Sequence, residues 1–345
     1  MFVHRVRDAD PNIRTDCLRE LGVWAKKYPD YYVSTSYLSY FTRGCNDTHT
    51  HARLETVKAL ANLYSRETFI NNARTLTMRL APRVTEMATR DVDLSVRVVA
   101  LQVITLIDRT GILQDEEDEE RDKVAKLVYD QEPRIRKAAG AFILGLWEER
   151  KEGLKAVWSG LRANKKKRAA NIAEDEMSNY LDWKSLAAVL LYTSKSLDDD
   201  SSEQPSALKS ALFIPSLSNT QMTRATAAVE SIGAEHELWK DWESLVDYLL
   251  VDHSTNEEDM WLLREDEETF MLQVLLACIE REENEEDEPD RTKTLIKVLP
   301  RLFAKHQGDV GRMTGILSIP GHMNLSLYLD MRMSSVSLMN SRGFG

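Results

Sequence analysis

The stretch DADPNIR at residues 8–14 has the same spacing as three later stretches: DTHTHAR at 47–53, DVDLSVR at 91–97 and DQEPRIR at 130–136. In each of them an aspartate precedes an arginine by six residues, and the arginines follow one another at intervals of 39, 44 and 39 residues. Each arginine leads into a run of helical periodicity; in the first run the apolar positions are Leu18, Leu21, Trp24, Ala25 and Tyr28. A period of about 40 residues with two helices per unit is typical of HEAT and armadillo solenoids. The sequence therefore predicts an all-α superhelix of HEAT-like or armadillo-like repeats.

The aspartate and the arginine of this motif have a structural interpretation. An acidic residue directly before a helix can cap its free N–H groups, and an arginine one turn inside the helix can reach the aspartate of a stacked neighbour. Coincidence is the alternative, because aspartate commonly starts helices and arginine is common on surfaces. Four matches at a nearly constant interval favour a ladder of aspartates and arginines that belongs to the repeat architecture.

Charge is distributed unevenly along the chain. The 345 residues have a formal net charge of −11, whereas residues 1–110 hold 16 basic and 12 acidic residues, so residues 111–345 carry −15. Binding to nucleic acid depends on the local field of a patch rather than on the total charge. The acidic total therefore does not exclude DNA as a partner.

Cysteine usage and apolar stretches indicate the compartment. Cys17, Cys45 and Cys278 lie far apart without a CxxC pair, which argues against a disulfide framework or a zinc site and fits a reducing environment. The longest apolar stretches, such as SLAAVLLY, reach only about half of a membrane span. The N-terminal MFVHRVRD lacks the hydrophobic core of a signal peptide. We expect a nuclear or cytoplasmic protein with no membrane segment.

Beyond residue 150 the repeated phrase fades, but helical periodicity continues in six segments: 154–161, 183–192, 220–232, 242–251, 267–280 and 292–303. Residues 113–122 are expected to end in a helix with an acidic first turn. The acidic segments near 197–206 and 281–290 are expected to be loops between helices, and 331–345 an irregular tail. Because neither end shows a convincing polar cap, we expect a segment of a longer array.

No arrangement typical of an enzyme is present. The sequence contains no G-x-S-x-G, P-loop, glycine-rich dinucleotide turn or H-E-x-x-H motif. His49 and His51 have no third ligand nearby, so a role at the start of a helix is favoured over metal binding. Cys17 precedes Leu18 in an apolar helix and is predicted to be a small core residue rather than a nucleophile. We expect a protein that is not an enzyme, with no metal, no cofactor and no small-molecule substrate.

The strongest basic cluster lies in NKKKRAAN and consists of Lys165, Lys166, Lys167 and Arg168. Four adjacent cations can neutralise phosphates and give salt-sensitive binding without reading bases. A solvated loop and part of a nuclear import signal are the two alternatives. We take duplex DNA contact as the hypothesis to test.

Residues 2–47 resemble the opening of the stromalin conservative domain, the hallmark of the stromal antigen (stromalin) subunits of cohesin. The family pattern FVHRYRD corresponds to FVHRVRD at 2–8, GIW to GVW at 22–24 and SYLKY to SYLSY at 36–40. The match is specific to about residue 90, and weaker similarity at 219–250 and 290–320 extends it to about residue 330. The resemblance implies a stromalin conservative domain over 1–90, continuing HEAT-like repeats over 91–330, and a longer, fungal-like family member as the parent protein.

The resemblance also implies a function. Such subunits are not enzymes; they bind the kleisin of cohesin and duplex DNA in the nucleus, on chromatin, and act in sister chromatid cohesion and chromosome segregation through the cell cycle. Partners expected from the family are the kleisin, the cohesin loader, the releasing factor and shugoshin-type regulators.

A groove on this domain takes up short aromatic motifs in the family, and its residues correspond here to Leu38, Tyr40, Arg43, Leu76, Arg79 and Leu80. The family's tryptophan is replaced by Arg43 and its phenylalanine by Leu80, while the arginine is kept as Arg79. Loss of the aromatic wall should weaken binding of an aromatic peptide by about 1–2 kcal/mol per ring contact. The alternative is that Arg79 is a plain surface residue and that Leu76 and Leu80 belong to the core.

Two other classes of protein remain to be compared. A HEAT-repeat adaptor for nuclear transport or trafficking would share the repeat but not the FVHR and SYLSY block. An enzyme on a helical-repeat scaffold would need an acidic residue and aromatic side chains converging in a basic cleft, and the sequence supplies no such set.

Overall fold

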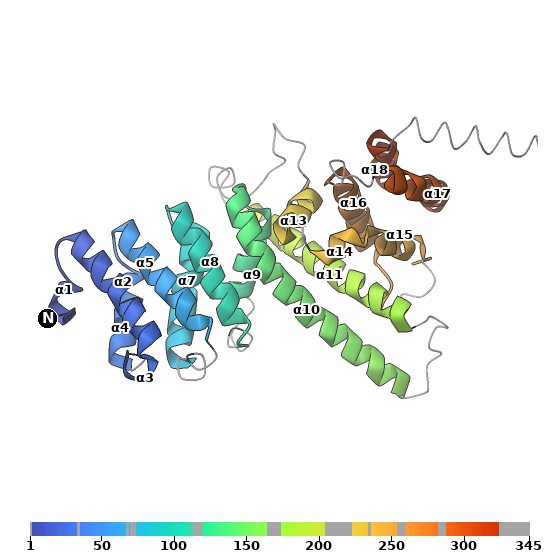
Figure 1. Cartoon of the computed structure of the whole chain (residues 1–345). Coiled ribbons are helices and arrows are strands. Elements are labelled where there is room, and N and C mark those ends of the chain that lie inside the picture. The colour runs from blue at the N-terminus through green and yellow to red at the C-terminus, as the bar shows by residue number, and fades with distance from the viewer. Residues whose placement is uncertain are drawn as a thin grey trace, which may run out of the picture. The chain divides into compact units, whose positions relative to one another are not determined.

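The computed structural model describes residues 2–32, 35–66, 69, 74–111, 113, 119–163, 174–203, 223–233, 236–253, 260–281 and 288–323. Every regular element in these ranges is a helix (Figure 1). The all-α helical-repeat fold predicted from the sequence is therefore confirmed. The chain divides into two compact units: unit 1 comprises Met1–Leu146 and Thr193–Pro215, and unit 2 comprises Trp147–Tyr192 and Ser216–Gly345.

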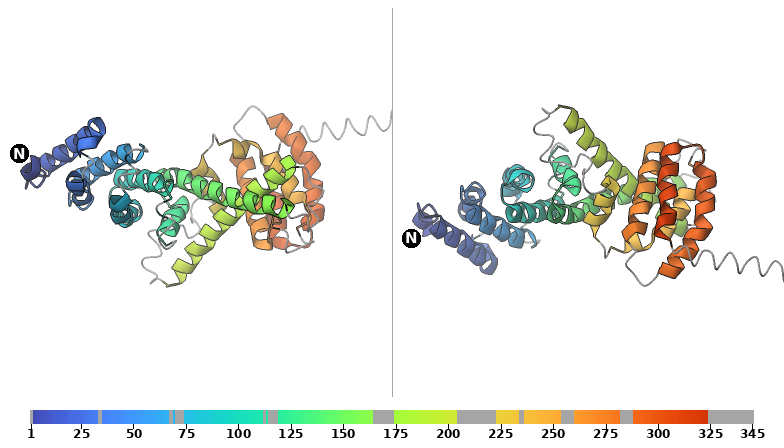
Figure 2. Two further views of the ribbon diagram at one scale, coloured as in Figure 1. Left: turned by 90° about the horizontal axis from the view of Figure 1, so that it is seen from below. Right: turned by 90° about the horizontal axis from the view of Figure 1, so that it is seen from above.

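Unit 1 begins with helices that follow the predicted repeat. They are α1 (Phe2–Arg5), α2 (Pro11–Lys27), α3 (Pro29–Tyr32), α4 (Thr35–Gly44), α5 (Thr50–Tyr64), α7 (Arg74–Arg90), α8 (Leu94–Asp108), α9 (Glu119–Ala125), the 3-10 helix η2 (Lys126–Tyr129) and α10 (Pro133–Ala163). The first helices of the repeats, α2, α5 and α8, contact one another in order, and so do the second helices, α4, α7 and α9. Figure 2 shows these blue to cyan helices as successive pairs.

Local sequence explains where these helices begin. The side chain of Asp10 accepts a hydrogen bond from the Asn12 N–H, and Pro11 occupies the first helical position of α2, where its missing N–H costs nothing. Asp93 caps α8 in the same way. The predicted apolar face of α2 is buried at Leu21, but Tyr28, which the sequence placed with it, is 53% exposed. Tyr28 lies beyond the last helical residue, Lys27, so the helical period no longer directs its side chain.

Unit 2 holds the remaining helices. They are α11 (Glu174–Glu203), α13 (Arg224–Ile232), α14 (Glu237–Lys240), α15 (Trp242–Leu250), α16 (Glu265–Arg281), α17 (Glu288–His306), α18 (Val310–Ser318) and the 3-10 helix η4 (Ile319–His322). The unit boundaries fall inside α10 and α11, so each of these two long helices contributes to both units. Helix α16 contacts α13, α15 and α18, which places it at the centre of unit 2.

The helical segments predicted beyond residue 150 lie in α10, α11, α13, α15, α16 and α17, and α9 has the expected acidic first turn. The loop predicted near 197–206 is wrong for residues 197–203, which continue α11. Leu197 is 3% exposed, and burial of this side chain holds the acidic segment in the helix. At 281–290 the flanking residues are helical and 282–287 lie outside the described residues, as do 204–206 and the predicted tail at 331–345.

Candidate functional site

Three ion pairs join consecutive repeats of unit 1. Arg14 binds Asp47 with Nε and Nη2, each at 2.8 Å from a carboxylate oxygen, and Arg53 binds Asp91 in the same way at 2.7 and 2.8 Å. The Nη2 of Arg97 lies 2.5 Å from Oδ2 of Asp130. The ladder predicted from the sequence is therefore confirmed for three steps, and the first two are bidentate.

Three of the four ladder arginines also bind the turn before their own helix, whereas Nε of Arg97 donates to the carbonyl oxygen of Ala88 at 3.1 Å. Nη1 of Arg53 donates to the carbonyl oxygens of Asp47 and Thr48 at 2.9 and 3.1 Å, and Arg14 makes the equivalent pair of bonds to residues 8 and 9. Arg136 repeats the pattern with residues 130 and 131. In Arg14 and Arg53, one guanidinium therefore binds both the turn before its own helix and the aspartate of the next repeat.

The ladder aspartates do not cap the helices, so that part of the sequence interpretation is wrong. Oδ1 of Asp47 accepts from the N–H of His49, two residues on, and Asp91 accepts from Asp93 in the same way. His49 and Asp93 are the N-cap residues of α5 and α8, so the ladder aspartate closes the turn that precedes the cap. Burial acts to raise the pKa of Asp91, but hydrogen bonds from Arg53 and from the Asp93 N–H outweigh it and hold this pKa below its ordinary value.

The six residues proposed for the partner groove lie on α4 and α7, which contact each other. Leu38 is 4% exposed and Leu80 is fully buried, so both are core residues, because each follows the buried face of its helix. Tyr40 and Leu76 are half-buried, while Arg43 and Arg79 are exposed. Four of the six side chains thus reach the surface, and Leu38 and Leu80 lie beneath them in the core.

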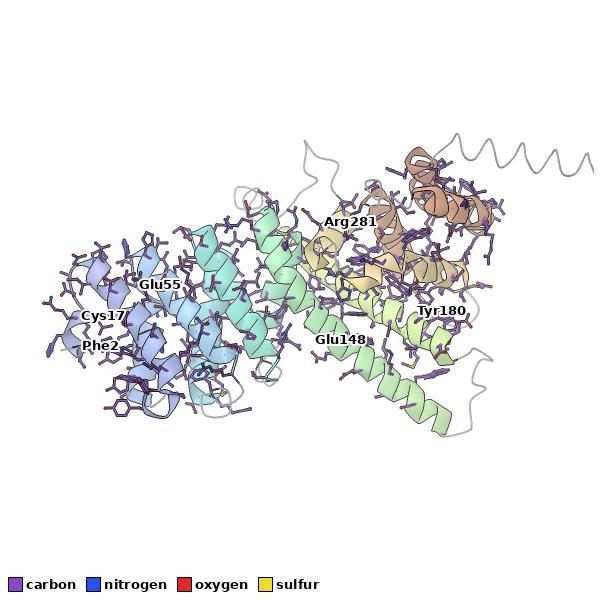
Figure 3. The ribbon with its side chains drawn as sticks, in the orientation of Figure 1. Phe2, Cys17, Glu55, Glu148, Tyr180 and Arg281 are labelled. Atoms are coloured by element: carbon purple, nitrogen blue, oxygen red, sulfur yellow. The ribbon has the colours of Figure 1, made fainter. Side chains whose placement is uncertain are left out.

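Arg43 lies against an aromatic platform. Its guanidinium carbon is 6.0 Å from the ring centre of Tyr40, which packs edge-to-face on Phe2 at 5.5 Å. Phe2, Tyr40 and Cys17 pack against the core of this unit, and Figure 3 shows Phe2 and Cys17 on neighbouring helices. Cys17 is half-buried, in accord with its predicted role as a small core residue. The Arg43 guanidinium therefore lies beside the Tyr40 ring, which itself packs on Phe2.

Arg83 was not anticipated from the sequence. Its Nε and Nη2 donate to the carbonyl oxygen of Cys45 at 3.2 and 3.0 Å, and its Nη1 lies 2.5 Å from Glu86. These bonds tie α7 to the C-terminal end of α4, close to Arg43. An isolated arginine within a helical run carries no signal for a contact 38 residues away.

The basic cluster Lys165, Lys166, Lys167 and Arg168 lies outside the described residues, between the end of α10 at Ala163 and the start of α11 at Glu174. Contact between this cluster and DNA therefore stays a prediction.

Within the described ranges, no group of histidine, cysteine or acidic side chains is arranged to hold a metal ion. His49 starts α5, as expected, with its ring 5.3 Å from that of His51. Burial raises the pKa of Cys45 to about 12, so this thiol is unreactive. Among the same residues, no helix has the length and apolar character needed to cross a membrane.

Unit 2 contains a buried ionic and aromatic cluster. Nζ of Lys305 donates to Glu268 at 2.5 Å and to the carbonyl oxygens of Leu249 and Val251 at 2.6 Å, which ties α17 to α15 and α16. Tyr180, labelled in Figure 3, stacks on Tyr248 with ring centres 5.0 Å apart. These contacts hold the helices of unit 2 together.

Comparison with known proteins finds two family matches. The model of the stromalin conservative domain matches residues 7–81, and the model of the HEAT-repeats domain of cohesin subunit SCC3/SA matches residues 280–338. Both matched regions of the chain resemble domains of the SCC3/SA cohesin subunits. The first match covers α2, α4 and α5, together with the part of α7 that carries Arg79, so the first ladder pair and the groove residues both lie in the stromalin domain.

Relatives extend this similarity over most of the chain. Cohesin subunit psc3 of Schizosaccharomyces pombe is 38% identical over 149 residues, which is 43% of this chain and 15% of that protein. Cohesin subunit SA-1 of Xenopus laevis is 26% identical over 356 residues, covering 96% of this chain and 25% of that protein. The solved structure of cohesin subunit Scc3 from Z. rouxii matches with a TM-score of 0.69 and 18% identity, over 99% of this chain and 38% of that one, and shows the same fold. The chain thus spans about a quarter or less of these two curated relatives.

Proposed function

We propose that this chain is part of a regulatory subunit of cohesin that is not an enzyme, and that it binds the kleisin and duplex DNA and docks chromatin regulators. The observation that carries the proposal is the order of the two family matches, with the stromalin domain first and the SCC3/SA repeats after it, in a chain that aligns over 96% of its length with a cohesin subunit. Such a protein acts in the nucleus, on chromatin, in sister chromatid cohesion and chromosome segregation.

The architecture suits this role. A helical-repeat array presents long, continuous surfaces on which an extended partner can lie, and it needs no catalytic centre to act. The ladder links the first helices of consecutive repeats in unit 1 through shielded ion pairs, which supports a regular spacing of the repeats. The family resemblance implies the partners: the kleisin, duplex DNA without sequence preference, and the loader, releasing factor or shugoshin-type regulators.

Capture of tiled fragments of the cohesin kleisin by the full chain tests the proposal. We expect one or a few adjacent fragments to bind, and the signal to survive competition by unrelated acidic protein. A HEAT-repeat adaptor for transport or trafficking would instead leave every kleisin fragment unbound, and that result would overturn the cohesin assignment.

The regulator site is proposed for the surface formed by Tyr40, Arg43, Leu76 and Arg79, with Leu38 and Leu80 supporting it from the core. Arg43 and Arg79 are exposed on contacting helices, which supports the choice of this surface. Reversing both charges (R43E with R79E) should lower capture of a family regulator while leaving kleisin binding intact. The matched control is R90E, which reverses another exposed arginine on α7. Equal loss in the control would remove the site from this surface.

A further inference from the structure

An exposed aromatic surface lies at the opposite end of α4 from Arg43. Tyr28 and Tyr31 are 53% and 63% exposed, and Tyr37, whose ring contacts that of Tyr31, is half-buried. We name Tyr28, Tyr31 and Tyr37, together with Lys26 and Lys27, the tyrosine patch. It shares no residue with the groove proposed for regulators.

Two rings of the tyrosine patch, those of Tyr31 and Tyr37, pack against each other and against Tyr32. Tyr31 lies 5.8 Å from Tyr37, and both contact Tyr32 with ring centres 5.0 Å away. Tyr32 in turn lies 5.6 Å from Trp24 of α2. The exposed ring of Tyr31 is therefore held by its neighbours before a ligand binds, which lowers the entropy that the ligand must overcome.

Two exposed lysines give the tyrosine patch its charge. Lys26 and Lys27 end α2, and Nζ of Lys27 lies 5.4 Å from the ring centre of Tyr28. The Lys26 carbonyl accepts a hydrogen bond from Arg66 at 2.8 Å, so the backbone that carries the lysines is anchored to the next repeat. Lys26 and Lys27 therefore add positive charge beside the exposed rings.

We propose that the tyrosine patch binds an extended, proline-rich protein segment that carries acidic residues. A polyproline II segment has no internal hydrogen bonds, so its carbonyl oxygens can accept from tyrosine hydroxyls and lysine ammonium groups, while proline rings lie on the exposed aromatic faces. Carboxylates of the segment complement Lys26 and Lys27. Two cations are too few for the continuous positive track that single-stranded nucleic acid needs, and a second copy of this surface would bring like charges together.

Fluorescence anisotropy of the full chain with a labelled peptide of alternating proline and glutamate tests this inference, which does not depend on the cohesin assignment. The variant Y28A with Y31A should weaken binding about tenfold, because two rings no longer meet the peptide. K26E with K27E should also weaken binding about tenfold and reduce its dependence on salt. Y31F with Y37F keeps the rings and removes the hydroxyls, and should weaken binding severalfold.

Two controls test whether binding depends on the tyrosine patch and on proline in the peptide. Y192A removes a tyrosine that is 58% exposed on α11 and should leave binding unchanged. A peptide with glycine in place of proline should bind at least about tenfold more weakly, since its flexible backbone loses more entropy. Equal binding of the glycine peptide, or equal loss in Y192A, would overturn the proposal. Tighter binding of oligothymidine than of the proline peptide would assign the surface to nucleic acid instead.

Discussion

Single arginines carry the connection between repeats in unit 1. The Arg53 side chain is 9% exposed and its partner Asp91 is 4% exposed, so this pair is far better shielded from water than the Arg19–Glu55 pair, where Arg19 is 49% exposed. A shielded pair depends on both partners, because the one left alone keeps its desolvation cost without compensation. Losing a ladder pair should therefore cost more stability than losing an ordinary surface ion pair.

Replacing Arg53 by alanine should lower the free energy of unfolding by about 3 kcal/mol, since it leaves the buried Asp91 carboxylate without a partner and also frees the turn at residues 47–48. Equilibrium denaturation of the full chain, followed by circular dichroism, measures the change. R19A is the matched control and should cost no more than about 1 kcal/mol. Equal losses in the two variants would contradict the structural role of the ladder.

His253 predicts a dependence of stability on pH. Its Nδ1 lies 3.2 Å from the N–H of Leu263 and accepts that bond, so Nε2 carries the proton and donates to the Tyr248 carbonyl at 3.0 Å. Burial, with a smaller contribution from Lys305, lowers the pKa of His253 to about 4. The unfolded chain takes up the proton near pH 6.5, whereas the folded chain takes it up only near pH 4. The free energy of unfolding should therefore decrease as the pH is lowered from about 6.5 to about 4, by about 1 kcal/mol per pH unit.

Free energies of unfolding measured at intervals from pH 7 to pH 4 test this prediction. The variant H253Q removes the titrating group and should have a shallower decline with falling pH than the unchanged chain. H51Q, which changes an exposed histidine on α5, is the control and should keep the original slope. Parallel curves for H253Q and the unchanged chain would show that other groups cause the decline.

Two pairs of helices lie very close together at glycine residues, which have no side chain. A Cβ atom on Gly22 of α2 would lie 2.6 Å from Cβ of Ala59 on α5, and one on Gly44 of α4 would lie 2.2 Å from Oγ1 of Thr56. Both distances are shorter than carbon and oxygen atoms tolerate. The ladder fixes the N-terminal ends of α2 and α5, and the small residues set how close the rest of the two helices can lie.

Replacing Gly22 by alanine should destabilise unit 1 by about 1–3 kcal/mol, because the added methyl group forces α2 away from α5. This loss should exceed the gain of up to about 1 kcal/mol that alanine gives over glycine within a helix. In G153A no atom lies within 4 Å of the new Cβ on α10, so only the gain should remain. Chemical denaturation of both variants measures the difference, and stabilisation by G22A would contradict the close approach.

At the scale of the whole molecule, the net charge does not decide whether a local part of the chain can bind DNA. The net charge of −11 would repel DNA if it were spread evenly, yet residues 1–110 carry a surplus of four positive charges and Lys165 to Arg168 form a local cationic cluster. A local cluster acts within a Debye length of about 8–10 Å, so distant acidic segments do not cancel it at physiological salt. DNA binding, where it occurs, should therefore be local and sensitive to salt.

The variant K166E with K167E should weaken binding of duplex DNA at every sequence and reduce the slope of log affinity against log salt by about 0.9 for each phosphate that is no longer neutralised. Titrations of labelled duplex at several salt concentrations give that slope. K240E with K297E reverses two exposed lysines elsewhere and should leave it unchanged. An unchanged slope in K166E with K167E would remove the basic cluster from the DNA surface.

Repetition in the sequence was sufficient to predict the helical-repeat fold, the interval of the ladder and the three pairings between repeats. These features depend on spacing along the chain, since a fixed period places the same side chain at the same point of each successive helix. The family resemblance likewise rested on contiguous motifs, and the matches to the stromalin and SCC3/SA domains confirm it.

The burial of individual side chains and the contacts between residues far apart in the chain could not be predicted from the sequence in the same way. Helical periodicity shows which residues share a face, but the neighbouring helix decides whether that face is covered, as it is at Leu38 and Leu80. The carbonyl that Arg83 binds and the exposure of Tyr28 and Tyr31 depend equally on how separate segments meet. Local interactions set helices and their order, whereas the surface left for partners is whatever the packing of non-adjacent helices does not cover.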